Sequence, residues 1–93
     1  MKKVYKYPLS IADRQIVRCS HGAQPLCVKL QRERPCLWCL VDETEKLSCI
    51  DILCVGTGMD IKLEPGKKLG RYLGTVLTSG GDYVFHYFVV EDE

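Results

Sequence analysis

Cysteine and histidine are the side chains of this 93-residue chain that could hold a metal ion or form a nucleophile–base pair. Cys36 and Cys39 have the C-x-x-C spacing of zinc and redox sites. On an extended strand, however, residues three apart point to opposite faces, so these two cannot bind one ion without a turn between them. No second C-x-x-C pair is present, and neither His21 nor His86 stands at a zinc-finger spacing. We therefore expect no metal and no cofactor.

The even number of cysteines raises the alternative of a disulfide framework, since six cysteines occur in a short chain. The chain begins Met1-Lys2-Lys3 and continues into charged and proline-containing sequence rather than an apolar signal segment. This start is typical of an unexported protein, where disulfides are rare. Four of the six cysteines also lie in apolar segments, where a free thiol behaves as a small hydrophobe. We expect free thiols in a soluble cytoplasmic protein.

The remaining motifs do not assemble into a catalytic set. His86 stands between Val84 and Phe88, a setting typical of a core or interface histidine rather than a catalytic base. Gly56-Thr57-Gly58 resembles half of a phosphate-binding loop, but no Lys-Ser/Thr pair follows it, so a tight turn is favoured. Without a positioned base, nucleophile or metal, the sequence predicts a protein that is not an enzyme.

Basic residues are concentrated in the first third of the chain. Residues 1–34 hold eight Lys and Arg against two Asp and Glu, or +6, while residues 35–93 hold five against ten, or −5. A site for an anion is one explanation, and pairing with the acidic remainder or solvated charge on outward strand positions is the other. The net charge of +1 and a pI near 7.6 do not favour nucleic-acid binding. The candidate binding residues are Arg14, Arg18, Lys29, Arg32, Arg34, Met59, Lys67, Lys68 and His86.

Short strands must position all of these residues. Alternating or continuous apolar runs predict strands at residues 4–7, 15–18, 26–31, 36–41, 47–55, 72–77 and 83–90. Pro8 confines the first to an edge, and the continuous run 36–41 is typical of a central strand. No stretch has sustained helical periodicity. We predict one all-β domain spanning residues 1–93, a small antiparallel barrel or sandwich of about seven short strands.

Residues 69–90 read as a hairpin around Ser79-Gly80-Gly81-Asp82. Both faces of its second arm, residues 83–90, are apolar, which favours self-association into a homo-oligomer. The preceding segment, residues 56–69, is expected to be an irregular loop, either functional or mobile. The expected core residues are Leu26, Val28, Leu30, Leu37, Trp38, Leu40, Ile50, Ile52, Leu73, Val76, Phe85 and Phe88, with a one-residue register error allowed in each strand.

Seven short motifs, in this order and spacing, are similar to a known family. They are Lys6-Tyr7-Pro8-Leu9, Gly22-Ala23, Pro35-Cys36-Leu37-Trp38, Leu40-Val41-Asp42, Gly56-Thr57-Gly58, Tyr72-Leu73-Gly74-Thr75 and Val84-Phe85-His86. Over nearly its whole length the chain resembles a family of short uncharacterised proteins of tailed bacteriophages and prophages. It departs at Ser20-His21, where a proline-containing turn is expected, and at Cys39, where alanine is expected. The resemblance implies a compact phage accessory protein and supplies no catalytic residues.

Two functions from different classes follow. The first is stoichiometric binding of a host protein, blocking a component of antiviral defence in the host cytoplasm, and it rests on small size and surplus apolar surface. The alternative is sequestration of an anionic small-molecule signal, such as a cyclic nucleotide, by the basic residues. Neither function involves a membrane, because no apolar run is long enough to span one.

Overall fold

Seven strands and one short 3-10 turn make up the computed structural model, which describes residues 1–93. The strands are β1 (Lys3–Pro8), β2 (Arg14–Ser20), β3 (Gln24–Gln31), β4 (Arg34–Val41), β5 (Leu47–Gly56), β6 (Lys67–Thr78) and β7 (Tyr83–Asp92), and the turn is η1 (Ser79–Gly81). Every strand pairing is antiparallel. The predicted all-β class and its seven short strands are confirmed.

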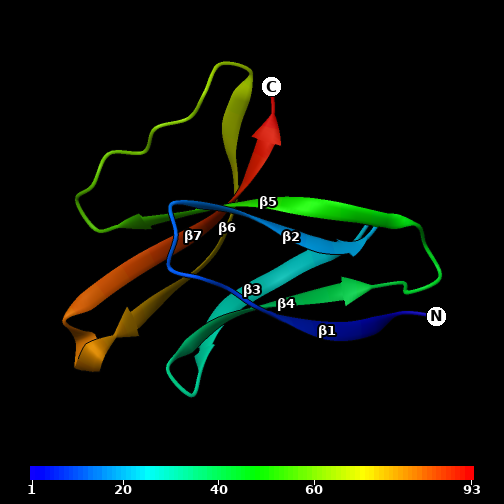
Figure 1. The fold of residues 1–93 in the computed structure, drawn as a ribbon, viewed down its shortest axis with the longest axis horizontal. Helices are drawn as coiled ribbons and strands as arrows, with labels where there is room; N and C mark the ends of the chain where they lie inside the picture. The colour runs from blue at the N-terminus through cyan, green and yellow to red at the C-terminus, as the bar shows by residue number, and fades with distance from the viewer.

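The strands form two sheets, a three-stranded sheet in the order β1-β4-β3 and a four-stranded sheet in the order β2-β5-β7-β6 (Figure 1). No strand hydrogen-bonds across from one sheet to the other, so the fold is a sandwich rather than a closed barrel. As its apolar run predicts, β4 is the centre of the smaller sheet. The strand that ends in Pro8 lies at an edge, where the missing N–H breaks no ladder bond.

The two sheets come very close where β3 lies against β6. A Cβ atom built on Gly74 would stand 2.4 Å from the carbonyl oxygen of Val28, and the φ angle of Gly74 is +154°. Glycine adopts this backbone angle without strain and has no Cβ atom that would clash with the carbonyl oxygen. Gly74 therefore allows the sheets to meet at this corner.

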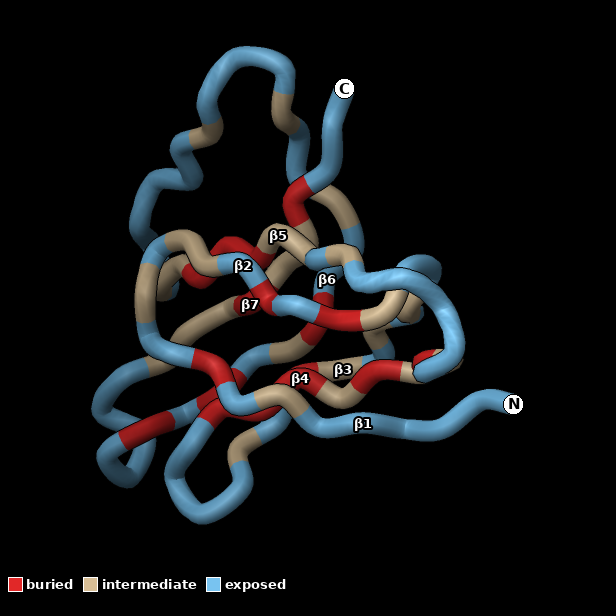
Figure 2. The backbone as a smooth tube through the Cα atoms, turned by 45° about the vertical axis from the view of Figure 1, so that its right-hand side comes forward, coloured by how far each residue is buried: buried red, intermediate tan, exposed pale blue.

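The core lies between the sheets and is formed by residues of β2 to β7 and by Leu9, while β1 adds only the partly buried Tyr7 (Figure 2). Leu37, Cys39 and Val41 of β4 face inward, as do Ile52 of β5 and Tyr87 of β7. Tyr87 is fully buried, and its hydroxyl donates a hydrogen bond to the carbonyl of Ser10 at 3.2 Å. The period of two that predicts strands thus also separates a core-facing row from an outward row in each of them.

Five of the predicted core residues are buried: Val28, Leu37, Ile52, Leu73 and Val76. Three are partly buried and pack against the core: Leu30, Ile50 and Phe85. The remaining four predictions are wrong, because these residues lie outside the core cluster: Leu26, Trp38, Leu40 and Phe88. Leu26 falls at a bulge in β3 and is 37% exposed. The other three occupy outward positions, since in β4 and β7 the odd-numbered residues face the core.

The predicted hairpin of residues 69–90 is confirmed as β6 and β7, joined through η1. Its turn uses positive φ angles at Ser79, Gly80 and Gly81. The irregular segment is shorter than predicted, because β5 continues to Gly56 and β6 begins at Lys67, leaving residues 57–66. The segment 67–69 gains order by pairing with the acidic end of β7, as shown by the register Lys67 with Asp92. No helix in the structure has the length and apolar character needed to cross a bilayer.

Candidate binding site

A cavity of about 460 Å³ lies between the end of β5 and the loop of residues 57–66. The strand pairing of β2 with β5 ends at Leu53, and the N–H of Cys54 donates to the carbonyl of Asp13 at 3.0 Å, so beyond Cys54 no strand covers this side of β5. Its apolar lining residues are Leu53, Cys54, Val55, Met59, Ile61 and Phe85. Its charged lining residues are Asp13, Arg14, Asp60 and Lys62. The cavity therefore has an apolar wall and a charge-balanced rim.

Arg14 connects the sheet to this loop. Its guanidinium group donates two hydrogen bonds to the carboxylate of Asp51, at 3.0 and 2.7 Å, and one to Glu64 at 2.8 Å. These hydrogen bonds raise the pKa of Arg14 above its ordinary value, and the bond from Arg14 lowers the pKa of Glu64. Two carboxylates thus pair with Arg14, one of the two cations that line the cavity. Arg14 positions the loop and is not a free anion-binding group.

A second cavity, of about 350 Å³, adjoins the first and shares Gly56, Met59 and Phe85 with it. Its other walls come from Thr57 and from the start of β7. The backbone N–H of Thr57 donates to the carbonyl of Val84 at 3.3 Å, which attaches the start of the loop to β7. Met59, which is 69% exposed, separates two hollows and offers a flexible apolar side chain to a ligand in either.

His86 of β7 lies on the outward face of the four-stranded sheet and links β6 to the start of the 57–66 loop. Its Nε2 atom is 2.6 Å from the hydroxyl of Thr57, and its Nδ1 atom is 2.9 Å from the hydroxyl of Thr75. The hydroxyl of Tyr72 continues this hydrogen-bond network, because its oxygen is 2.5 Å from the hydroxyl oxygen of Thr75. A hydroxyl–imidazole pair occurs in nucleophilic catalysis, where a third group orients the base and donors bind an oxyanion. Here the third group is a neutral hydroxyl, and the network joins the sheet surface to the loop.

The six cysteines are free thiols. Cys39 faces the core, whereas Cys36 lies on the outward face of β4, so the C-x-x-C pair is split as predicted for a straight strand. Burial raises the pKa of the Cys39 thiol to about 12. No group of three or more His, Cys, Asp and Glu residues is placed to hold a metal ion.

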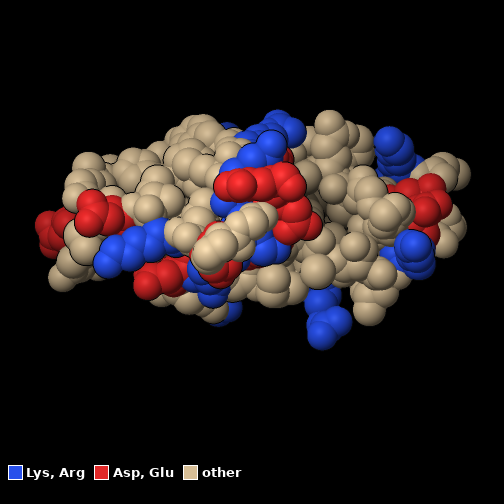
Figure 3. All heavy atoms as spheres, turned by 90° about the horizontal axis from the view of Figure 1, so that it is seen from above, with Lys and Arg blue, Asp and Glu red and all other residues tan.

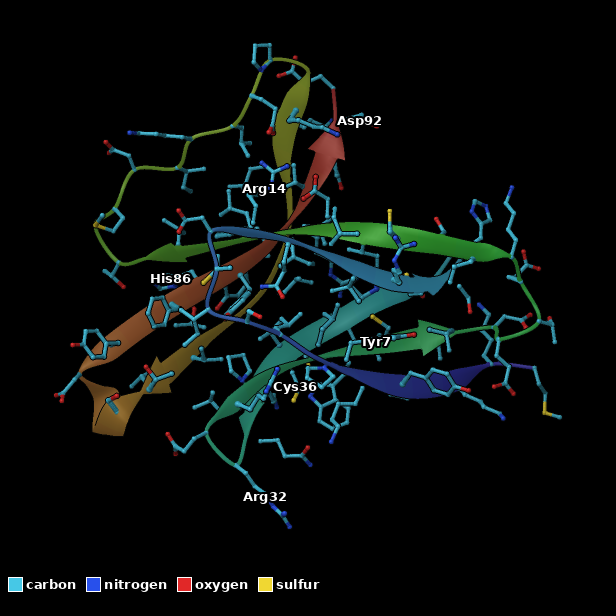
Figure 4. All side chains as sticks on the ribbon, viewed as in Figure 1. Tyr7, Arg14, Arg32, Cys36, His86 and Asp92 are labelled. Carbon is cyan, nitrogen blue, oxygen red and sulfur yellow. The ribbon has the colours of Figure 1, made fainter.

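The structure divides the nine candidate binding residues among separate places. Met59 and His86 both lie near Thr57. Arg14 and Arg18 lie on β2, and Lys67 and Lys68 begin β6 opposite Asp92 and Glu91. Lys29, Arg32 and Arg34 lie on the β3–β4 hairpin of the other sheet, and Figure 4 shows Arg32 at its tip, far from Arg14. The basic residues therefore do not form one site.

Salt bridges account for much of the charge around the loop. Lys67 pairs with Asp92 at 2.7 Å, and Arg14 binds Asp51 and Glu64. In the view of Figure 3, basic and acidic side chains are accordingly intermixed near the centre. Glu64, Thr75 and Tyr72 were not predicted as site residues. Asp51 carried a sequence signal, as a carboxylate within an apolar strand, but its partner on β2 could be identified only from the sheet register.

Comparison with known proteins places the chain in a family. Neither a search of curated proteins nor a search of solved structures found a match. Residues 1–93 match the family described as a domain of unknown function (DUF7352). Because the match covers the entire chain, the protein belongs to the DUF7352 family.

Proposed function

We propose that this protein is a phage accessory protein that acts by stoichiometric binding to a host protein and blocks a component of antiviral defence in the host cytoplasm. The binding surface is the outward face of the four-stranded sheet together with the 57–66 loop. The observation that supports this assignment is the amount of apolar surface that the sandwich leaves uncovered there.

Apolar side chains occur on all four strands of that face. Ile16 of β2 is 58% exposed, and Tyr72 and Leu77 of β6 are 54% and 53% exposed. Phe88 of β7 lies between them, with its ring centroid 5.5 Å from that of Tyr72. The face has no helix over it, because η1 is the one helical segment of the fold. Apolar surface of this extent, beside a loop, is typical of protein interaction sites.

The loop adds adaptable contacts at the edge of the same surface. Met59 and Ile61 are 69% and 44% exposed and border the larger cavity. A partner side chain that entered the cavity would meet an apolar wall and a balanced rim of charges, which suits a neutral or apolar group. Such a seated side chain is the kind of anchor that dominates protein interfaces.

An anionic small molecule is less well supported as the ligand at this surface. Of the cations near the larger cavity, Arg14 is already bound by two carboxylates, and Lys62 shares the rim with Asp13 and Asp60. Four carboxylates, Asp13, Asp51, Asp60 and Glu64, face two cations there, so the Coulomb energy of a phosphate group would be unfavourable. This charge distribution leaves a protein partner as the preferred assignment.

The test compares two lysine substitutions at exposed apolar residues. Leu77→Lys lies within the proposed surface, while Ile11→Lys, at 51% exposure in the β1–β2 connection, lies outside it. Each is expressed in bacteria that carry one defence system, and the efficiency of phage plating is measured. We expect wild type and Ile11→Lys to restore plating and Leu77→Lys to fail, with circular dichroism showing all three folded.

The stoichiometric mechanism is tested with the purified defence protein. If binding causes inhibition, residual defence activity falls in proportion to added protein and reaches its minimum near equimolar ratio. Complete inhibition by a small fraction of an equivalent would demonstrate turnover and refute the proposal. Light scattering of the protein alone gives its oligomeric state, because the same apolar face could also pair two copies.

A further inference from the structure

The outward face of the three-stranded sheet has a different character from the face just described. Cross-strand register defines its residues: Lys6 lies opposite Trp38, Trp38 opposite Cys27, and Cys36 opposite Lys29. Residues directly opposite each other share a face, and β4 turns Leu37, Cys39 and Val41 to the core. The outward positions that matter here are Lys6, Lys29, Gln31, Arg34, Cys36 and Trp38.

Positive charge on this face is unopposed. Lys6, Lys29 and Arg34 occupy its three strands, and none of them takes part in a salt bridge. No Asp or Glu occurs among its strand positions. The turn that joins β3 to β4 adds Arg32 and Glu33, which cancel each other. Three strand cations therefore remain, although the whole chain has a net charge of only +1.

Trp38 lies opposite Lys6 on the central strand, and Lys29 and Arg34 follow along the same face toward the β3–β4 turn. Trp38 is half-buried, so part of its indole ring is accessible. The Lys6 ammonium group is 6.0 Å from the centre of the ring, at the outer limit of a cation–π contact. That group also donates a hydrogen bond to the side-chain oxygen of Gln31, from the far strand. These two contacts hold the ammonium group of Lys6 beside the indole. Cys36, between Trp38 and Arg34 on the same face, is 3% exposed, and its thiol donates to the carbonyl of Arg34 at 3.6 Å.

We propose that this face binds single-stranded nucleic acid, with a base stacked on Trp38 and phosphates contacted by Lys6, Lys29 and Arg34. An open sheet surface that combines an aromatic ring with unpaired cations supplies the two interactions such ligands use, stacking on the base and attraction to the backbone. A folded acidic protein would also pair with these cations and cover the indole, and it becomes the preferred occupant if no oligonucleotide binds. The site is on the sheet opposite the proposed protein-binding surface, so the two proposals can fail independently.

The separation of charge between the two sheets explains why composition conceals this site. On the four-stranded sheet and its loop, carboxylates bind Arg14 and Lys67. Five of the twelve acidic residues take part in salt bridges, none of them with Lys6, Lys29 or Arg34, so the outward face of the three-stranded sheet keeps its positive charge. A pI near 7.6 reflects the total charge of the chain and does not show how the charge is distributed between the two sheets.

The experiment uses the single tryptophan of the chain as its probe. The purified full-length protein is titrated with an oligothymidylate of about 12 nucleotides, within the range of small single-strand sites, while Trp38 emission is recorded. A fluorescein-labelled copy of the oligonucleotide gives anisotropy in parallel. We expect the oligonucleotide to quench the emission of Trp38, and the quenching and the anisotropy to saturate at the same concentration. With three cations engaged, the affinity should fall about twentyfold between 50 and 200 mM salt.

Matched charge reversals locate the site. Arg34→Glu and Arg18→Glu replace the same exposed residue type with the same change in net charge, but Arg18 lies on the other sheet. We expect Arg34→Glu to weaken binding at least tenfold and Arg18→Glu to leave it within about twofold, with both variants folded. Trp38→Phe should weaken binding by about fivefold or more, since a smaller ring stacks less well.

Several results would overturn the proposal. Equal effects of the two reversals would mean attraction to the whole molecule and not to this face. Anisotropy without quenching of Trp38 would place the ligand elsewhere. If thymidine monophosphate or a cyclic dinucleotide bound as tightly as the oligonucleotide, the ligand would be a free nucleotide and not a nucleic-acid strand. If neither the oligonucleotide nor the nucleotides bound saturably at 50 mM salt, both kinds of ligand would be excluded.

Discussion

Replacing Gly74 with alanine should destabilise the fold more than a glycine-to-alanine change in an open turn. The new methyl carbon would stand 2.4 Å from the Val28 carbonyl oxygen, a backbone atom that cannot rotate away. The two sheets must then separate locally, at a cost typical of overpacking, about 1–3 kcal/mol. A non-glycine residue at a φ of +154° adds about 1–3 kcal/mol of backbone strain.

The combined loss is about 2–6 kcal/mol, a large part of the roughly 5–14 kcal/mol expected for a domain of this length. Urea unfolding monitored by Trp38 fluorescence measures it directly. Gly58→Ala is the matched control, because Gly58 also has a positive φ, +82°, but a Cβ atom added there would meet nothing within 4 Å. We expect Gly58→Ala to cost about 1–2 kcal/mol, the backbone component alone.

The difference between the two variants isolates the close contact between the sheets. If Gly74→Ala cost no more than Gly58→Ala, the sheets could separate freely at this corner, and the argument that Gly74 sets their approach would be wrong. Gly74→Ser should behave like Gly74→Ala, since it adds the same Cβ atom at the same place.

Three further predictions concern the core, its thiols and the loop. Tyr87→Ala should cost about 3–5 kcal/mol and Phe85→Ala about 1–3 kcal/mol in the same urea assay, because Tyr87 is fully buried and Phe85 only partly; a larger loss at Phe85 would contradict the observed register of β7. The folded pKa of Cys39 is raised to about 12 from an ordinary value near 9, so its contribution to stability is complete below pH 9 and is lost as the pH rises from 9 to 12. The free energy of unfolding should therefore fall by about 1.4 kcal/mol more between pH 8 and 10 in wild type than in Cys39→Ala, and equal slopes would argue against this burial effect. Glu64→Gln should speed proteolysis of the 57–66 loop and leave the urea midpoint of unfolding nearly unchanged. Arg14→Met should also speed this proteolysis, and it should lower the free energy of unfolding by about 1–2 kcal/mol because the pair with Asp51 is lost. Unchanged cleavage in both variants would show that Arg14 does not position the loop.

The amino-acid sequence by itself determined the strands, the central place of β4, the edge place of β1 and the pairing of β6 with β7. A period of two in apolar residues fixes an extended segment, a continuous apolar run such as 36–41 requires a covered central strand, and Pro8 requires an edge. These are local properties, so they can be read without knowing what each strand contacts. The split of Cys36 from Cys39 follows from the same alternation.

Only the tertiary structure decided which face of each strand meets the core and which charges neutralise one another. Trp38 and Leu37 are neighbours with similar hydrophobicity, and register across β4 alone turns one outward and the other inward. Likewise, Arg14 and Arg34 are the same type of residue. The pairing of β2 with β5 brings Asp51 to Arg14, whereas Arg34 lies on a sheet face without carboxylates. Contacts between residues distant in sequence set these outcomes, because electrostatic and packing energies depend on distance in space.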